Sequence, residues 1–155
     1  MKSACLCLSL LLALSFSPAT AGQQETVKPS TETFGNDLRL KIEQFLGRPY
    51  GRGTRGPKRF DCSGFVWRVM QENGIRMKRT SARKLYFSLP KIKEEEKWQL
   101  GSVVFFNNMK HCGIVNDESS FYHASSTAGT TLSEFAPYWR ERISGFRRLP
   151  IKKAT

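Results

Sequence analysis

Apolar residues change their spacing near Trp98, and no other feature of this 155-residue sequence constrains its fold as strongly. Before Trp98 they recur every three or four residues in segments 37–46 and 63–73, and a shorter helix is expected over 81–87. After Trp98 they form short β-rich runs between turn residues, at 103–106, 111–115, 120–124 and 143–149. Helices followed by strands predict an α+β domain, with N-terminal helices packed on an antiparallel sheet.

The first 21 residues have the form of a secretory signal peptide. Lys2 precedes an apolar run from Ala4 to Phe16, which is shorter than the roughly 20 residues that cross a membrane. Ala19-Thr20-Ala21 matches a signal peptidase site. The sequence therefore predicts export to the periplasm, the cell wall or the extracellular space. After the signal peptide at 1–21 we expect a flexible tether at 22–36, the folded domain at 37–150 and a basic tail at 151–155.

The chain is strongly basic, with 25 Lys and Arg against 13 Asp and Glu and a formal net charge of +12. Without the signal peptide it keeps 24 basic and 13 acidic residues, a charge of +11. A charge of this size predicts polyanionic partners and says little about the fold. Export argues against nucleic acid and leaves anionic membranes and anionic wall polymers as partners. We expect a monomer.

Cysteine usage points to chemistry at one thiol. Cys5 and Cys7 leave with the signal peptide, so the exported domain keeps Cys62 and Cys112, too few for a disulfide framework. Cys62 precedes the helix predicted over 63–73, and a helix N-terminus favours the reactive thiolate. The amides of Cys62 and Ser63 could bind an oxyanion there. The alternative is a small buried apolar side chain, which describes most free cysteines.

The chain has two histidines, His111 and His123, and both fall in predicted strands. A three-residue turn at 116–118 would pair Val115 with Ser119 and therefore His111 with His123. Paired residues face the same side of a sheet with Cβ atoms about 5 Å apart. One imidazole could then serve as the base for Cys62 while the other orients it.

Several motifs resemble the NlpC family of cell-wall cysteine peptidases in order and spacing. They are Tyr50 with Gly53, Phe60-Asp61-Cys62-Ser63-Gly64-Phe65-Val66, Arg79-Thr80-Ser81, Gly101 with Val104-Phe105-Phe106, His111-Cys112-Gly113-Ile114, Tyr122-His123-Ala124 and Tyr138-Trp139. The resemblance extends from about Leu38 to Leu149. It implies a papain-like fold that needs neither a metal nor an organic cofactor.

The resemblance also implies a role for each site residue. Cys62 would be the nucleophile, His111 the base and His123 the residue that orients His111. The residues implied to line the substrate cleft are Tyr50, Asp61, Ser63 and Ser81. Cys112 should point away from His111 into the core, because side chains alternate along a strand, and both thiols should stay unpaired.

The function implied is cleavage of amide bonds in peptidoglycan stem peptides, either γ-D-glutamyl-diamino acid bonds or the D,D cross-bridge. Three alternatives use the same scaffold: a noncatalytic basic module that binds the wall, an amidase or acyltransferase, and an antibacterial toxin. The sequence departs from the family pattern at Thr54, Lys78, Ser102 and Cys112, outside the three residues implied for catalysis.

Overall fold

The computed structural model of the protein describes residues 31–150, and of residues 31–34 it describes the backbone alone. The described helices are α1 (Thr31–Glu43), α2 (Cys62–Glu72), α3 (Ala82–Ser88), the 3-10 helix η1 (Glu94–Glu96) and α4 (Pro137–Arg140). The strands are β1 (Ser102–Phe106), β2 (His111–Val115), β3 (Ser120–Ser125), β4 (Gly129–Glu134) and β5 (Ile143–Arg148). The prediction of an α+β domain is confirmed. No helix in this part of the chain is long and apolar enough to cross a bilayer.

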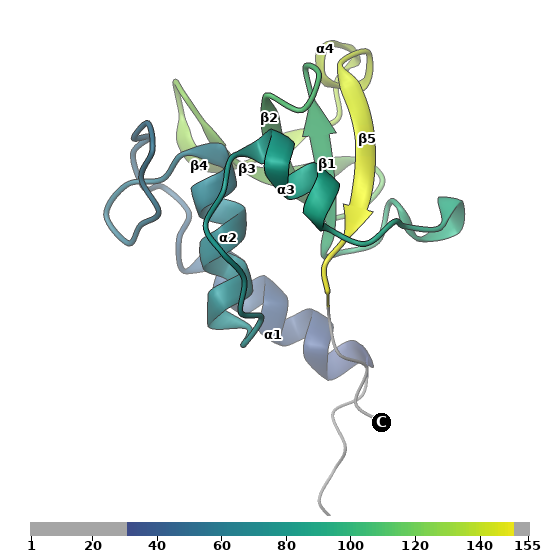
Figure 1. Ribbon diagram of the computed structural model, residues 1–155, viewed down its shortest axis with the longest axis horizontal. Helices are drawn as coiled ribbons and strands as arrows, with labels where there is room; N and C mark the ends of the chain where they lie inside the picture. Colours follow the sequence, from purple (N-terminus) through teal and green to yellow (C-terminus); the bar gives the residue numbers. More distant parts are fainter. Residues whose placement is uncertain (1–30, 151–155) are drawn as a thin grey trace, which may run out of the picture.

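The five strands form one antiparallel sheet in the order β4-β3-β2-β1-β5. Consecutive strands β1 to β4 are neighbours, and β5 returns to pair with β1. Helix α2 packs against β2 and β3, and α1 packs against α2 (Figure 1). The N-terminus of α2 is thereby held next to the strands that carry the two histidines.

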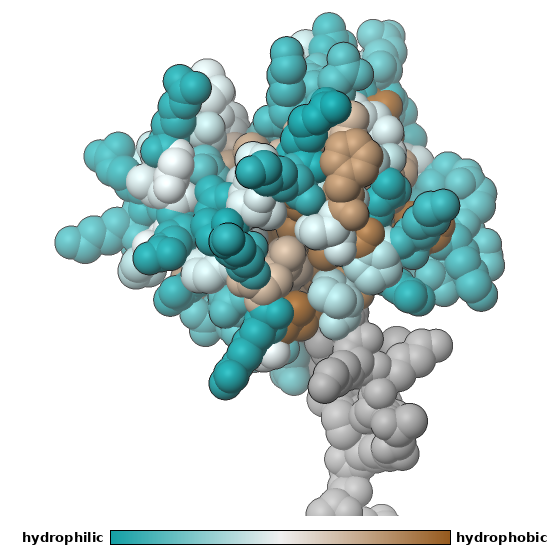
Figure 2. Space-filling view, in the orientation of Figure 1, coloured by the Kyte–Doolittle hydropathy of each residue, from teal (hydrophilic) through white to brown (hydrophobic). Residues whose placement is uncertain are grey.

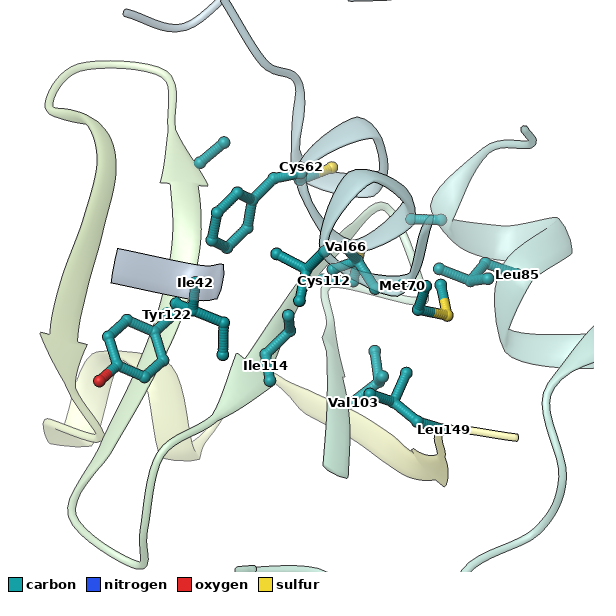
Figure 3. Close-up of a cluster of buried hydrophobic side chains, with 14 of the residues drawn as sticks. Ile42, Cys62, Val66, Met70, Leu85, Val103, Cys112, Ile114, Tyr122 and Leu149 are labelled. Atoms are coloured by element: carbon teal, nitrogen blue, oxygen red, sulfur yellow. The ribbon is translucent and has the colours of Figure 1, made fainter. Parts of the chain in front are cut away.

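The sheet has a buried apolar cluster on each face. The larger cluster lies between the helices and the sheet, and Figure 3 shows side chains that the helices and the strands contribute to it. It includes Leu38, Ile42, Phe65, Val66, Val69, Met70, Val103, Phe105, Cys112 and Ile114. The smaller cluster covers the opposite face and is mostly aromatic. It contains Val104, Phe106, Val115, Phe121 and Phe135, with Trp98, Trp139, Ile143 and Phe146 packed against it.

Helix α1 begins at Thr31 rather than at Asp37 and ends at Glu43 rather than at Leu46. The boundary predicted for the tether at 22–36 is therefore wrong for residues 31–36, which are helical. Apolar periodicity could not detect this first part, because Thr31 to Asn36 form no apolar stripe. The predicted signal peptide at 1–21, the rest of the tether at 22–30 and the tail at 151–155 lie outside the described residues.

Strand β4 was not predicted from the sequence. Its residues, Gly129 to Glu134, are mainly small and polar, and only the first two are buried. The strand lies at the edge of the sheet, where one side of the backbone has no neighbouring strand. An edge position permits polar side chains, so the strand lacks the apolar alternation that identified the others.

The register between β2 and β3 also differs from the prediction. Val115 pairs with Phe121 and Gly113 with His123, so His111 and His123 are not directly opposite. The connection is longer than expected, because the Asn116 amide bonds the Ser120 carbonyl at 3.0 Å and Asp117 caps the turn inside it. The displacement of two residues keeps both histidines on the same face.

Candidate active site

Cys62 is the first residue of α2, and the loop before it is fixed by hydrogen bonds. Asp61 is the N-cap, and its Oδ1 accepts from the Gly64 amide at 2.6 Å. The Asp61 amide donates to the Thr54 carbonyl at 3.1 Å. A Cβ atom on Gly64 would collide with that carbonyl, so a glycine is required where the loop crosses the helix. The Asp-Cys-Ser-Gly motif thus places the thiol at a rigid helix end.

Two amides in the first turn of α2 have no hydrogen-bond partner within the described chain. The Phe65 amide donates to the Asp61 carbonyl at 2.9 Å, and Gly64 is capped by the Asp61 side chain. The amides of Cys62 and Ser63 remain, as the geometry of a helix N-terminus dictates. They are suited to bind developing negative charge beside the thiol.

Arg79 joins the cap of α2 to the segment before α3. Its Nη2 donates to both carboxylate oxygens of Asp61 at 2.6 Å each. Its Nη1 donates to Ser63 Oγ at 3.0 Å and also to the Thr80 carbonyl. Ser63 Oγ in turn donates to Asp61 Oδ1 at 3.2 Å. The carboxylate is therefore saturated by charge-assisted hydrogen bonds, and Arg79, which lies outside α2, holds the start of the helix in place.

The environment of Cys62 favours the thiolate. Its pKa is lowered from 9.0 to about 5, first by a hydrogen bond from the Cys112 thiol, then by a hydrogen bond and the positive charge of His111, against burial, which raises it. The sulfur also lies 4.0 Å from the Lys110 carbonyl. Cys62 is 9% exposed, so the thiol is largely enclosed.

Cys112 lies closer to Cys62 than predicted. It is fully buried on the helical face of the sheet, as strand alternation requires, and Figure 3 shows it near Cys62 and Val66 of α2. The Cys112 thiol is nevertheless near enough to Cys62 to be the first cause of its lowered pKa, because α2 places its first residue over that same face. Burial raises the pKa of Cys112 well above the ordinary value, so it stays a protonated donor. Both thiols are free.

The loop between β1 and β2 delivers His111 to the site. Asn107, Asn108 and Met109 have φ angles of 52°, 53° and 63°, in the left-handed region. Asparagine adopts that region readily, whereas Met109 does so at a cost of roughly 1 kcal/mol. The Lys110 amide closes the turn on the Phe106 carbonyl at 3.1 Å, and His111 follows as the first residue of β2.

The two imidazoles are hydrogen-bonded, with His111 Nε2 at 2.8 Å from His123 Nδ1. Their residues are diagonal neighbours, since Gly113 is the one opposite His123. A Cβ atom on Gly113 would lie 3.1 Å from His123 Cβ and 2.6 Å from the Tyr122 carbonyl. Because Gly113 has no side chain, the space beside it is free for the His123 side chain to reach His111.

Aromatic rings enclose the histidine pair. Trp139 stacks on His111 with ring centroids 5.5 Å apart and meets His123 edge-on at 5.2 Å. Phe121 covers another side of His123 at 4.8 Å. His123 is 2% exposed, and burial followed by the charge of His111 lowers its pKa to about 3. His123 is therefore neutral at physiological pH and can accept a hydrogen bond from His111.

The four residues implied to bind substrate have different surroundings. Tyr50 forms a β-bridge with Phe60, two residues before Cys62, and burial followed by the charges of Cys62 and Asp61 raises the pKa of its phenol. Asp61 and Ser63 are buried and bonded to Arg79. Ser81 is exposed and caps α3, accepting from the Lys84 amide at 3.4 Å. Asp61 and Ser63 thus flank Cys62 and Tyr50 pairs just before it, whereas Ser81 is joined to Cys62 only through the Arg79–Thr80 segment.

Sequence reasoning missed three residues that support the site. Arg79 and Trp139 belong to motifs already quoted for the resemblance, so their position was available but their contacts were not. Ser133 Oγ lies 2.9 Å from His123 Nε2, on the strand that the sequence did not predict. Within the described residues no three His, Cys, Asp or Glu side chains are placed to hold a metal ion.

Curated relatives match this chain over most of its length. A protein of Listeria grayi named probable endopeptidase p60 is 31% identical over 135 residues, 85% of this chain and 26% of the relative. The chain thus spans about a quarter of that relative. A protein of Escherichia coli K12 named murein DD-endopeptidase MepS/murein LD-carboxypeptidase is 28% identical over 145 residues, 84% of this chain and 76% of the relative.

Solved structures share the fold. A lipoprotein-like NLP/P60 protein of Staphylococcus aureus superposes with a TM-score of 0.67 at 26% identity, over 81% of this chain and 45% of that one. RipD of Mycobacterium tuberculosis, described as a non-catalytic NlpC/p60 domain protein adapted to peptidoglycan binding, shares the fold alone, with a TM-score of 0.62 at 13% identity over 76% and 98%. Residues 47–148 match the NlpC/P60 family as a whole, and the chain belongs to that family of papain-like α+β domains.

Proposed function

We propose that the protein is an exported cysteine endopeptidase that hydrolyses amide bonds in peptidoglycan stem peptides. Cys62 is the nucleophile, His111 the general base and acid, and His123 orients His111. The observation that carries this proposal is the arrangement of one thiol and two imidazoles: the pKa of Cys62 is lowered to about 5, and His111, which contributes to that shift, bonds His123 at 2.8 Å. A noncatalytic scaffold has no need to lower a thiol pKa in this way.

The proposed reaction uses groups already in place. The Cys62 thiolate attacks the scissile carbonyl carbon to form a C–S bond, and the resulting oxyanion faces the Cys62 and Ser63 amides. The protonated His111 gives its proton to the leaving amine as the C–N bond breaks. A water molecule, deprotonated by His111, then hydrolyses the thioester and regenerates the thiolate.

The bond cleaved is either γ-D-glutamyl-diamino acid or the D,D cross-bridge. The name of the Escherichia coli relative, a murein DD-endopeptidase, supports the second. Tyr50 beside the thiol and the exposed Ser81 are the residues we propose to contact the stem peptide. Asp61 is occupied by Arg79 and by the helix amide, so we assign it to holding the nucleophile in place.

A basic loop next to the site supports association with an anionic wall surface. Arg52, Arg55, Lys58 and Arg59 are exposed, and none of them forms an ion pair with a described residue. The loop projects at the left of Figure 1, where the surface in Figure 2 is hydrophilic. Wall layers rich in carboxylates and phosphates would be attracted there, with an affinity that falls as salt rises.

Digestion of purified peptidoglycan, followed by mass spectrometry of the soluble fragments, tests the proposal. We expect stem-peptide fragments from the wild type and none from Cys62→Ala, and the new termini identify the bond. Wall binding without fragments would favour the noncatalytic module. Fragments capped by an added amine would favour an acyltransferase, and a wall of one foreign species cleaved selectively would favour a toxin.

A further inference from the structure

The hydrogen-bond chain from the nucleophile does not end at His123. His123 Nδ1 faces His111 Nε2 at 2.8 Å, and its other ring nitrogen, Nε2, lies 2.9 Å from Ser133 Oγ. We propose that Ser133 is a positioning residue that fixes the tautomer of His123 by accepting a hydrogen bond from Nε2–H. This inference deepens the proposed function and rests on it.

The chemistry of a neutral imidazole makes this bond decisive. The pKa of His123 is lowered to about 3, mainly by burial, so at neutral pH the ring carries one N–H and one bare nitrogen. When His111 is protonated, its Nε2–H must donate to His123. That donation requires a bare Nδ1 on His123, and the single proton must then lie on Nε2, facing Ser133.

The other tautomer would work against the ion pair of Cys62 and His111. A proton on His123 Nδ1 would point at His111 Nε2, and His111 could meet it only with a bare nitrogen. The imidazolium that balances the thiolate would lose its partner. Orientation of His111 by His123 is therefore productive in one tautomer only.

The surroundings of His123 leave this choice to Ser133. Phe121 and Trp139 cover the ring of His123 at 4.8 and 5.2 Å and offer no strong acceptor. Ser133 lies on β4 opposite Phe121, so the strand pairing holds its hydroxyl at the edge of the imidazole. Within the described residues, His111 and Ser133 are the side chains that hydrogen-bond His123.

Long-range 1H–15N NMR of the histidine side chains at neutral pH reads the tautomer directly. The chain has two histidines, so the spectrum is simple, and His111→Ala assigns the signals. We expect the Nε2–H tautomer of His123 in the wild type and in Ser133→Thr, which keeps the hydroxyl. Ser133→Ala should give a mixture of tautomers and lower kcat roughly 10- to 100-fold, the usual loss when an orienting partner is removed, with KM unchanged.

Thr131→Val is the matched control, because Thr131 lies on the same strand and its hydroxyl bonds only a neighbouring backbone carbonyl at 3.2 Å. It should leave both the tautomer and kcat as in the wild type. A wild-type Nδ1–H tautomer, or a Ser133→Ala protein that keeps either the wild-type tautomer or the wild-type kcat, overturns the inference. The NMR reading needs no turnover, so it remains decisive even if the wild type fails to cleave the wall.

Discussion

Cys62 lies at a helix end held by charged side chains, whereas the two histidines lie on strands and are packed by aromatic rings. On the helix side, the Asp61 carboxylate accepts from Arg79, Ser63 and the Gly64 amide at 2.6 to 3.2 Å. On the sheet side, one chain of hydrogen bonds runs from His111 through His123 to Ser133.

This difference separates two ways of fixing a reactive group. The helix side has several bonds to one carboxylate, so its geometry survives small changes but depends on the balance of two charges. On the sheet side, aromatic packing sets the positions of the two imidazoles, and the single proton on the His123 ring sets the direction of the hydrogen bonds. We therefore expect substitutions of the residues that support Cys62 on the helix side to affect stability most, and substitutions of those that support His111 on the sheet side to affect catalysis most.

The largest effect should follow removal of the reacting groups. Cys62→Ala and His111→Ala should each lower the rate of wall cleavage by roughly 10⁶-fold, and the double variant should be little worse, because the two act as a unit. Fragment release by mass spectrometry measures the rate, and circular dichroism shows whether the fold is kept. Additive losses in the double variant would break the assumed coupling between the two sides.

His123→Ala should retain measurable activity. Losing the residue that orients the base costs roughly two powers of ten less than losing the base, so a fall of roughly 10⁴-fold is expected. Removing an enclosed ring also opens a cavity, so the melting temperature must be followed beside kcat. A loss as large as that of His111→Ala would mean that His123 does more than orient.

Arg79→Met should destabilise the fold by about 3 kcal/mol, because it leaves the Asp61 carboxylate, 12% exposed, without its partner. Urea unfolding measures the change. The double variant Arg79→Met with Asp61→Asn removes both charges and is the control. The pair acts through charge balance if the double variant is the more stable of the two, and the idea fails if it is less stable.

Cys112→Val gives the smallest effect and separates hydrogen bonding from packing. The Cys112 thiol is the largest contributor to the lowered pKa of Cys62, so its loss should raise that pKa from about 5. Catalysis needs the thiolate, so the acidic limb of the kcat/KM profile should move to higher pH by about one unit, the equivalent of one hydrogen bond. An unmoved limb would assign the shift to His111 and the helix end alone.

The sequence predicted the helix side better than the sheet side. The Asp-Cys-Ser-Gly motif and its local cap fixed Cys62 at a helix start, because capping depends on neighbouring residues. The histidines were placed on the right face but two residues out of register, because the Asp117 turn involves side-chain bonds that no spacing rule anticipates. Alternation fixes a face, and only the turn fixes the register.

What the sequence could not predict lies in long-range contacts. Ser133 stands on a polar edge strand without apolar alternation, and Arg79 meets Asp61 across 18 residues. Cys112 was predicted to point into the core, and it does, but its contact with Cys62 depends on how α2 crosses the sheet. Helix placement over a sheet is decided by packing of the whole core.

The pH dependence of alkylation at Cys62 tests most directly whether the two sides meet to form a thiolate. Iodoacetamide reacts with the thiolate, and mass spectrometry of the labelled peptide separates Cys62 from the buried Cys112. The predicted rate is half-maximal near pH 5 in the wild type, following the lowered pKa, and moves to higher pH in His111→Ala. A wild-type rate that is half-maximal near pH 9.0, the value of an ordinary cysteine, would contradict the account.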